Sequence, residues 1–257
     1  MKNKAKKSFS LLWLGVLMTF CMLWTIPAFA QSLKVAAAAN LQSVIKVLGE
    51  DFKQKTGITI EPIIGSSGNL TAQIKNGAPY DVFLSADMSF PEGLFQAGFS
   101  TKKPIVYAQG SLIICSTQNL SFENWETLLK SDKVKKIAIA NPKIAPYGKA
   151  AEEALQQKGI LDDLRPKVVY GESISQVNTY ITTGVVDLGF TTQALVKDAA
   201  NKTQLYWKEI DPKFYSPIEQ GMVLLKRSEN NQDAEKFYQY ILNPAAKAIF
   251  LEYGYRK

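Results

Sequence analysis

Short apolar segments alternate with segments of helical periodicity along most of the chain. Residues 33–38 form an apolar run, residues 41–57 repeat apolar side chains at helical spacing up to a glycine, and residues 58–64 form a β-branched run. Further strands are expected at 81–84, 136–140, 167–170 and 186–190, and further helices at 70–75, 89–98, 125–129, 148–158, 175–182, 234–242 and 244–252. Strands that alternate with helices favour parallel pairing through right-handed crossovers. The predicted fold class is therefore α/β, with mainly parallel sheets flanked by helices.

Two helix starts carry recognisable capping residues. Ser89 is followed three positions later by Glu92, which is the spacing of a capping box. Asn243 precedes Pro244, and proline is favoured at the first helical position because it lacks the N–H that would go unbonded there. We expect both serine and asparagine to act as N-caps.

Two extended apolar segments are longer than the other expected strands, at residues 104–115 and 218–225. Two such segments are what a two-lobed protein needs in order to cross between its lobes and return. We therefore expect a first lobe formed by residues 31–108 and 217–257, and a second lobe formed by residues 109–216. A single compact domain is the alternative, since a chain of this size is within the usual domain range.

The first thirty residues resemble a secretory signal peptide. Lysines crowd the first seven positions, residues 11–26 are apolar, and Ala28-Phe29-Ala30 fits the cleavage pattern of small residues around a larger one. Cleavage would leave Gln31 first and send the chain to the periplasm. The alternative is an uncleaved membrane anchor, but a span normally needs about 20 apolar residues, more than this run offers.

The charge and cysteine content exclude several classes of protein. The net charge is +7, and four of the basic residues lie in the leader, so the mature chain is close to neutral and lacks the basic surface that nucleic-acid binding requires. The chain has no histidine, which excludes Ser-His and Cys-His catalysis. Cys21 follows bulky residues that do not fit a lipobox, and Cys115 is then the only cysteine left after cleavage, so we expect no internal disulfide and a buried strand position for it.

Four neutral loops precede expected helices, at residues 36–40, 65–69, 141–148 and 171–175. They are rich in small residues, hydroxyls and amides. Each could be no more than a capping loop or a turn. In an open parallel sheet, however, ligands bind where strands run into helix starts. Taken together, the loops predict a neutral site of N–H and O–H donors, which suits a fully deprotonated oxyanion because no buried countercharge is needed.

The chain resembles the periplasmic molybdate-binding proteins of ATP-driven transporters over nearly all of its mature length. The resemblance is carried by residues 35–41, 65–70, 146–155 and 187–190, and most specifically by Gly-Ala-Pro-Tyr-Asp-Val-Phe-Leu-Ser-Ala-Asp at 77–87. It implies a two-lobed type II periplasmic-binding-protein fold with a ligand cleft between the lobes. It further implies a monomeric binding protein, neither an enzyme nor dependent on a cofactor, that captures molybdate or tungstate and delivers it to an inner-membrane ABC permease.

The resemblance also assigns ligand contacts to positions of this chain. They fall on Ala39, Asn40 and Ser67 in the first lobe, and on Tyr147 and Ile174 in the second, where Ile174 acts through its main-chain N–H. The oxyanion would be held by these groups, with no direct ligand to the metal atom. Many members of the family have serine in place of Asn40 and tyrosine in place of Thr192. The hydroxyl of Tyr147 is expected to replace the one missing at Thr192.

Three other functions compete with this interpretation. A sulfate- or phosphate-binding protein is the nearest, although phosphate would want a carboxylate acceptor and Glu172 is the only one in the four loops. A secreted hydrolase could use Ser66 or Ser67 with a lysine base, but neither serine begins a Ser-x-x-Lys motif. An interaction-only domain is the third.

Overall fold

The computed structural model describes residues 32–256 and contains two five-stranded sheets. The predicted signal peptide lies outside the described residues. The first sheet has the order β2 (Ile60–Gly65), β1 (Leu33–Ala38), β3 (Val82–Leu84), β10 (Ile218–Leu224) and β4 (Ile105–Gly110). The second has the order β7 (Val168–Gly171), β6 (Ile137–Ala140), β8 (Leu188–Thr192), β5 (Leu112–Ser116) and β9 (Tyr206–Glu209).

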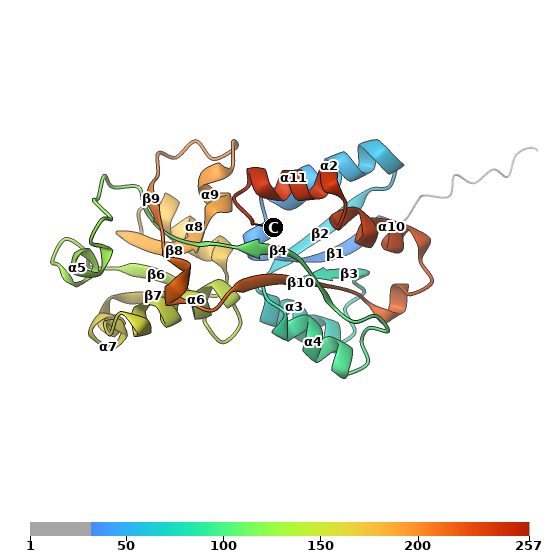
Figure 1. Cartoon of the computed structure of the whole chain (residues 1–257), viewed down its shortest axis with the longest axis horizontal. Coiled ribbons are helices and arrows are strands. Elements are labelled where there is room, and N and C mark those ends of the chain that lie inside the picture. Colours follow the sequence, from blue (N-terminus) through green and yellow to red (C-terminus); the bar gives the residue numbers. More distant parts are fainter. Residues whose placement is uncertain (1–31, 257) are drawn as a thin grey trace, which may run out of the picture. The chain divides into compact units, whose positions relative to one another are not determined.

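The two sheets share one pattern of pairing. In the first, β1 runs parallel to β2 and β3, while β10 is antiparallel to β3 and β4. In the second, β6 runs parallel to β7 and β8, while β5 is antiparallel to β8 and β9. The α/β class with parallel cores is confirmed, and each sheet gains its antiparallel strands where the chain enters it from the other sheet or returns to it (Figure 1).

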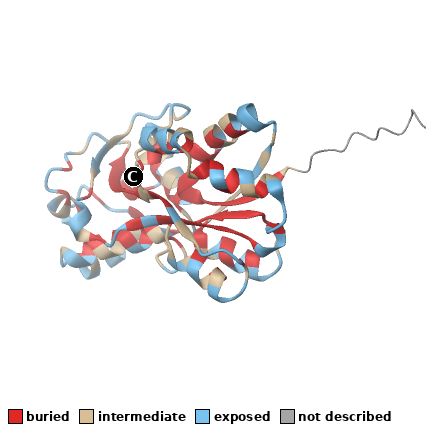
Figure 2. Cartoon of the chain, turned by 45° about the vertical axis from the view of Figure 1, so that its right-hand side comes forward, coloured by how far each residue is buried: buried red, intermediate tan, exposed pale blue. Residues whose placement is uncertain are grey.

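Helices cover both faces of the first sheet. Successive residues of β1 point to opposite faces, and Val35 packs with α2 (Val44–Thr56), α10 (Gln232–Ile241) and α11 (Pro244–Glu252). Ala36 packs on the other face, with α3 (Ser67–Lys75) and α4 (Ser89–Gln96). Figure 2 shows the resulting buried strands under helices whose outer faces are exposed.

The second sheet is surrounded by shorter helices. These are α5 (Trp125–Lys130), α6 (Pro146–Gln157), α7 (Leu161–Leu164), α8 (Ile174–Thr182) and α9 (Gln193–Lys197). Four 3-10 helices complete the described chain: η1 (Ala39–Leu41), η2 (Arg165–Lys167), η3 (Pro212–Phe214) and η4 (Lys226–Ser228). No helix among residues 32–256 is long and apolar enough to cross a membrane.

The apolar segment at residues 104–115 passes from the first sheet to the second, as predicted for a crossing segment. The segment divides at Ser111 into β4, which joins the first sheet, and β5, which joins the second. The prediction that residues 218–225 form the returning segment was wrong: the chain returns between Glu209 and Ile218, and β10 belongs entirely to the first sheet. A break at this point is needed because one straight strand cannot hydrogen-bond within two different sheets.

The two expected N-caps have different outcomes. Asn243 caps α11, and its side chain accepts a hydrogen bond of 2.9 Å from the N–H of Ala246. The prediction for Ser89 was wrong, because Met88 is the N-cap of α4 and Ser89 lies inside the helix. The Ser89 hydroxyl instead donates to Asp87, at 2.9 Å.

Cys115 lies fully buried in β5, as predicted. Burial in apolar surroundings raises the pKa of its thiol to about 12, so the thiol is neutral near pH 7. A neutral, enclosed thiol is neither a nucleophile nor a metal ligand.

Candidate functional site

A small cavity lies where the strands of the first sheet end and two helices of the second half of the chain begin. It is lined by Ala38, Ala39, Asn40, Ser66, Ser67, Ala86, Ala145, Pro146, Tyr147 and Ile174. All five residues that the sequence nominated are among them: Ala39, Asn40, Ser67, Tyr147 and Ile174. The structure therefore brings together positions that are up to 135 residues apart in the chain.

The first sheet contributes the ends of three neighbouring strands. Asn40 lies in η1, directly after β1, and Ala86 follows β3. Ser66 is the N-cap of α3 and Ser67 is its first residue, so this helix begins three residues earlier than expected. Because parallel strands end at the same edge of a sheet, these loops converge there. Asn40, Ser66 and Ser67 are all buried.

The second half of the chain contributes the first turns of α6 and α8. Pro146 occupies the start of α6, and Tyr147 follows it with its side chain buried. Ile174 begins α8, whose cap Ser173 accepts a hydrogen bond from the N–H of Gln176 at 3.3 Å. The first N–H groups of a helix have no partner within it and carry its positive dipole end, so both starts present donors to the cavity.

The two sides of the cavity touch at Gly68. Its N–H donates to the main-chain oxygen of Ile144 at 2.9 Å. A Cβ atom at Gly68 would lie 2.8 Å from Ile144 Cβ, closer than real side chains come. Glycine is thus required here because the two backbones approach one another directly.

The lining carries no charged side chain. Burial holds the pKa of the Tyr147 hydroxyl well above its usual value, so this group keeps its proton throughout the physiological range. Glu172, the one carboxylate in the predicted loops, is exposed and outside the lining. A neutral cavity with hydroxyl and N–H donors can hold an anion by hydrogen bonds alone.

Several buried polar atoms of the cavity residues have no partner in the protein. Among residues 32–256, three buried side-chain atoms lack a hydrogen-bond partner: Asn40 Oδ1, Ser66 Oγ and Tyr147 Oη. All three belong to residues of this cavity. Leaving such a group unsatisfied costs about 1–3 kcal/mol, so the concentration of three at one place indicates a site made for a polar ligand.

Ser66, Ala86 and Thr192 illustrate what the sequence alone did not resolve. Ser66 belonged to a loop predicted to offer hydroxyl donors but was not nominated as a contact, and neither was Ala86. Thr192 does not line the cavity. It caps α9, and its hydroxyl accepts from the N–H of Ala194 at 3.4 Å. The position of Ser66 just before an expected helix was the signal that could have identified it.

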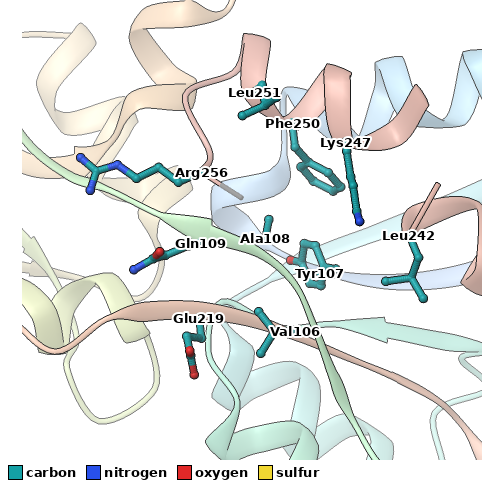
Figure 3. Close-up of a pocket in the computed structure, with 10 residues that line it drawn as sticks. All are labelled: Val106, Tyr107, Ala108, Gln109, Glu219, Leu242, Lys247, Phe250, Leu251 and Arg256. Atoms are coloured by element: carbon teal, nitrogen blue, oxygen red, sulfur yellow. The ribbon is translucent and has the colours of Figure 1, made fainter. Parts of the chain in front are cut away.

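A larger cavity of about 410 Å³ lies elsewhere, between β4 and α11 (Figure 3). Apolar side chains, including Tyr107, Phe250 and Leu251, line it together with Lys247 and Arg256. It contains none of the nominated residues and none of the three unpartnered atoms. The smaller cavity is therefore the candidate site, although it has less room.

The fold has two sheets joined by crossing segments, and the loops of both sheets form a neutral cavity. This arrangement defines a solute-binding protein of the type II periplasmic class. The family model described as bacterial extracellular solute-binding protein matches residues 33–256. The chain belongs to this family. It is a binding protein and not an enzyme, and its place of action is extracytoplasmic.

Individual relatives are similar over most of their length. The chain is 36% identical to the molybdate-binding protein of Rhodobacter capsulatus, covering 90% of each chain. It is 33% identical to that of Azotobacter vinelandii, covering 89% of this chain and 91% of the relative. The solved structure titled as the Azotobacter vinelandii periplasmic molybdate-binding protein superposes with a TM-score of 0.83 and 35% identity, covering 88% of this chain and 99% of the other.

Proposed function

We propose that this chain captures molybdate, and tungstate equally, as the intact oxyanion and delivers it to an inner-membrane ABC permease. The names of its relatives support molybdate as the ligand. The neutral cavity supports a dianion bound by hydrogen bonds. Ala39, Asn40, Ser67, Tyr147 and Ile174 are the proposed contacts, with no direct ligand to the metal atom.

The observation that carries the proposal is the pair of buried hydroxyls, Ser66 Oγ and Tyr147 Oη, that lack a partner and belong to residues lining a cavity without charged side chains. Hydroxyl and N–H donors can replace the hydration shell of a dianion, and the starts of α3, α6 and α8 add their positive dipole ends. The lining holds no carboxylate that could take a proton from the ligand. This favours the fully deprotonated oxyanions over phosphate near neutral pH.

The experiment for this proposal is calorimetric titration of the mature chain with molybdate. We expect one saturable site per chain, and a rise of the unfolding temperature that grows with ligand concentration, because the ligand binds only the folded state. A chain that is folded and shows neither heat of binding nor stabilisation would refute the proposal.

We further propose that residues 1–30 are a cleaved leader. We also propose that the mature protein is a monomer with two lobes. One lobe is formed by residues 31–108 and 217–257, and the other by residues 109–216. The leader is supported by its sequence pattern alone. Intact-mass measurement on protein recovered from the exporting cell should give a chain that starts at Gln31. A mass that includes Met1, or a lipid on Cys21, would contradict the leader.

A further inference from the structure

The main-chain amide of Ala86 determines which way Ser67 uses its hydroxyl. The Ala86 N–H donates to Ser67 Oγ at 3.0 Å, in buried surroundings. An N–H can only donate, so the Ser67 oxygen accepts this bond and its own proton points elsewhere. Ser67 lines the cavity, and its hydroxyl is therefore left as a donor for a ligand.

The main-chain carbonyl group of Ala86 determines the orientation of the Gln220 side-chain amide. Gln220 is fully buried, and its Nε2 donates to the Ala86 oxygen at 3.1 Å and to the Ile218 oxygen at 3.3 Å. Main-chain oxygens can only accept, so the NH₂ group of Gln220 must face them and its Oε1 must face the other way.

Gln220 in turn orients the amide of Asn40. Asn40 Nδ2 donates to Gln220 Oε1 at 2.8 Å, and the reversed amide would oppose two acceptor oxygens. Tyr255 adds a second restraint. Its hydroxyl donates to the main-chain oxygen of Asn40 at 2.8 Å and accepts from Asn40 Nδ2 at 3.0 Å. Both hydrogens of the Asn40 NH₂ group are thus used, and Oδ1 is left buried without a partner.

We infer that Gln220 and Tyr255 are positioning residues of the anion site. They hold Asn40 with its amide NH₂ turned away from the ligand, so that Ser67 donates a side-chain hydrogen bond from the first-sheet side and Asn40 does not. The inference rests on the proposed function. It adds which group donates and which accepts at Ser67 and Asn40. An oxyanion without protons offers only acceptors. The Asn40 side chain then contributes no hydrogen bond to such a ligand, and the oxygen it leaves unpartnered is an acceptor.

Two substitutions by alanine test which of the two side chains donates to the ligand. Ser67→Ala should weaken molybdate binding by about tenfold or more, since a donor to a charged acceptor is lost. Asn40→Ala should weaken it by less than about threefold, because no donor to the anion is removed. A loss of tenfold or more in a folded Asn40→Ala variant would overturn the inference, since it would show that the amide donates to the ligand.

A double-mutant cycle tests the positioning role. Gln220→Leu releases the Asn40 amide, and its effect on molybdate affinity should differ by at least about threefold between the chain with Asn40 and the chain with Asn40→Ala. Tyr80→Phe is the matched control, because Tyr80 is also buried and its hydroxyl donates to Gln73 Oε1 at 2.6 Å, not to Asn40, Gln220 or Tyr255. Its effect should be the same in both backgrounds. An equal effect of Gln220→Leu in both would assign Gln220 a purely structural part and overturn the inference.

Two further measurements keep the outcomes separate. Unfolding temperatures without ligand establish that each variant folds. Should Gln220→Leu not fold, Tyr255→Phe takes its place in the cycle, because it removes the other hydrogen-bond partner of the Asn40 amide. If the unaltered chain binds sulfate but not molybdate, the proposed function fails. The same variants are then titrated with sulfate, and the same difference between them is expected.

Discussion

Tyr147 and Gly110 form a contact at the centre of the molecule that neither residue type would suggest by itself. Tyr147 comes from α6 beside the second sheet, whereas Gly110 is the last residue of β4 in the first. A Cβ atom at Gly110 would lie 2.1 Å from Tyr147 Oη and 2.9 Å from its ring carbon Cζ. The glycine therefore leaves the space that the tyrosine hydroxyl occupies.

Gly110→Ala should displace Tyr147 and weaken molybdate binding by about tenfold or more, because a buried ring cannot yield without moving the start of α6. Titration calorimetry measures the effect. Gly93→Ala is the control, since nothing lies within 4 Å of a Cβ at that position in α4, and alanine is the better helix former. An unchanged affinity in Gly110→Ala would refute a binding role for the Tyr147 position.

Cys115 gives a second prediction at this scale, which concerns pH. Burial raises the pKa of its thiol to about 12 in the folded chain, above the value near 9 of a free thiol. The folded state thus favours the neutral form, and the resulting stability is complete below pH 9 and is lost as the pH rises from 9 towards 12. A thiol reagent at pH 8 should label the mature chain only after unfolding. Rapid labelling of the folded chain would contradict the buried placement.

At the scale of elements, capping can be predicted only where the residue before the helix is itself extended. Asn243 has the extended backbone of a cap, whereas Ser89 lies one residue inside α4 because the chain already turns at Met88.

The strand β9 was not expected from the sequence. Its residues 206–209 are polar and aromatic, and they form a short, partly exposed edge strand that lacks a clear apolar pattern.

Asn243→Ala should lower the free energy of unfolding by about 1 kcal/mol, because the N–H of Ala246 loses its acceptor. Ser89→Ala should change it by only a few tenths of a kcal/mol, since Ser89 caps nothing. Denaturant unfolding at constant pH measures both. Equal losses in the two variants would mean that capping does not account for the stability of α11.

At the scale of the whole molecule, the loops around the cavity were easier to predict than the orientation of its side chains. Loops that precede helices can be recognised locally, and the five residues that the family resemblance nominated lie around one cavity. The orientation of the Asn40 amide could not be predicted, because it depends on Gln220 and Tyr255, which lie 180 and 215 residues further along the chain. The crossing within residues 104–115 was predicted, but its position at Ser111 was not, because the residues on both sides of Ser111 are extended.

The size of the ligand should decide selectivity in such a cavity. Molybdate, tungstate and sulfate share charge and shape, so fixed donors on the two sides distinguish them by how well the anion spans the gap. Sulfate is smaller and should lose several hydrogen bonds to a charged acceptor. A loss of about 4 kcal/mol corresponds to about a thousandfold in affinity. Phosphate should bind more weakly still, because no carboxylate in the lining can accept its O–H group.

Competition against bound molybdate, followed by calorimetry, tests this account most directly. Tungstate should displace molybdate at about equal concentration, whereas sulfate should need about a thousandfold excess and phosphate should not displace it at all. Displacement by equimolar sulfate, or a preference for phosphate, would contradict the account and make another tetrahedral oxyanion the ligand.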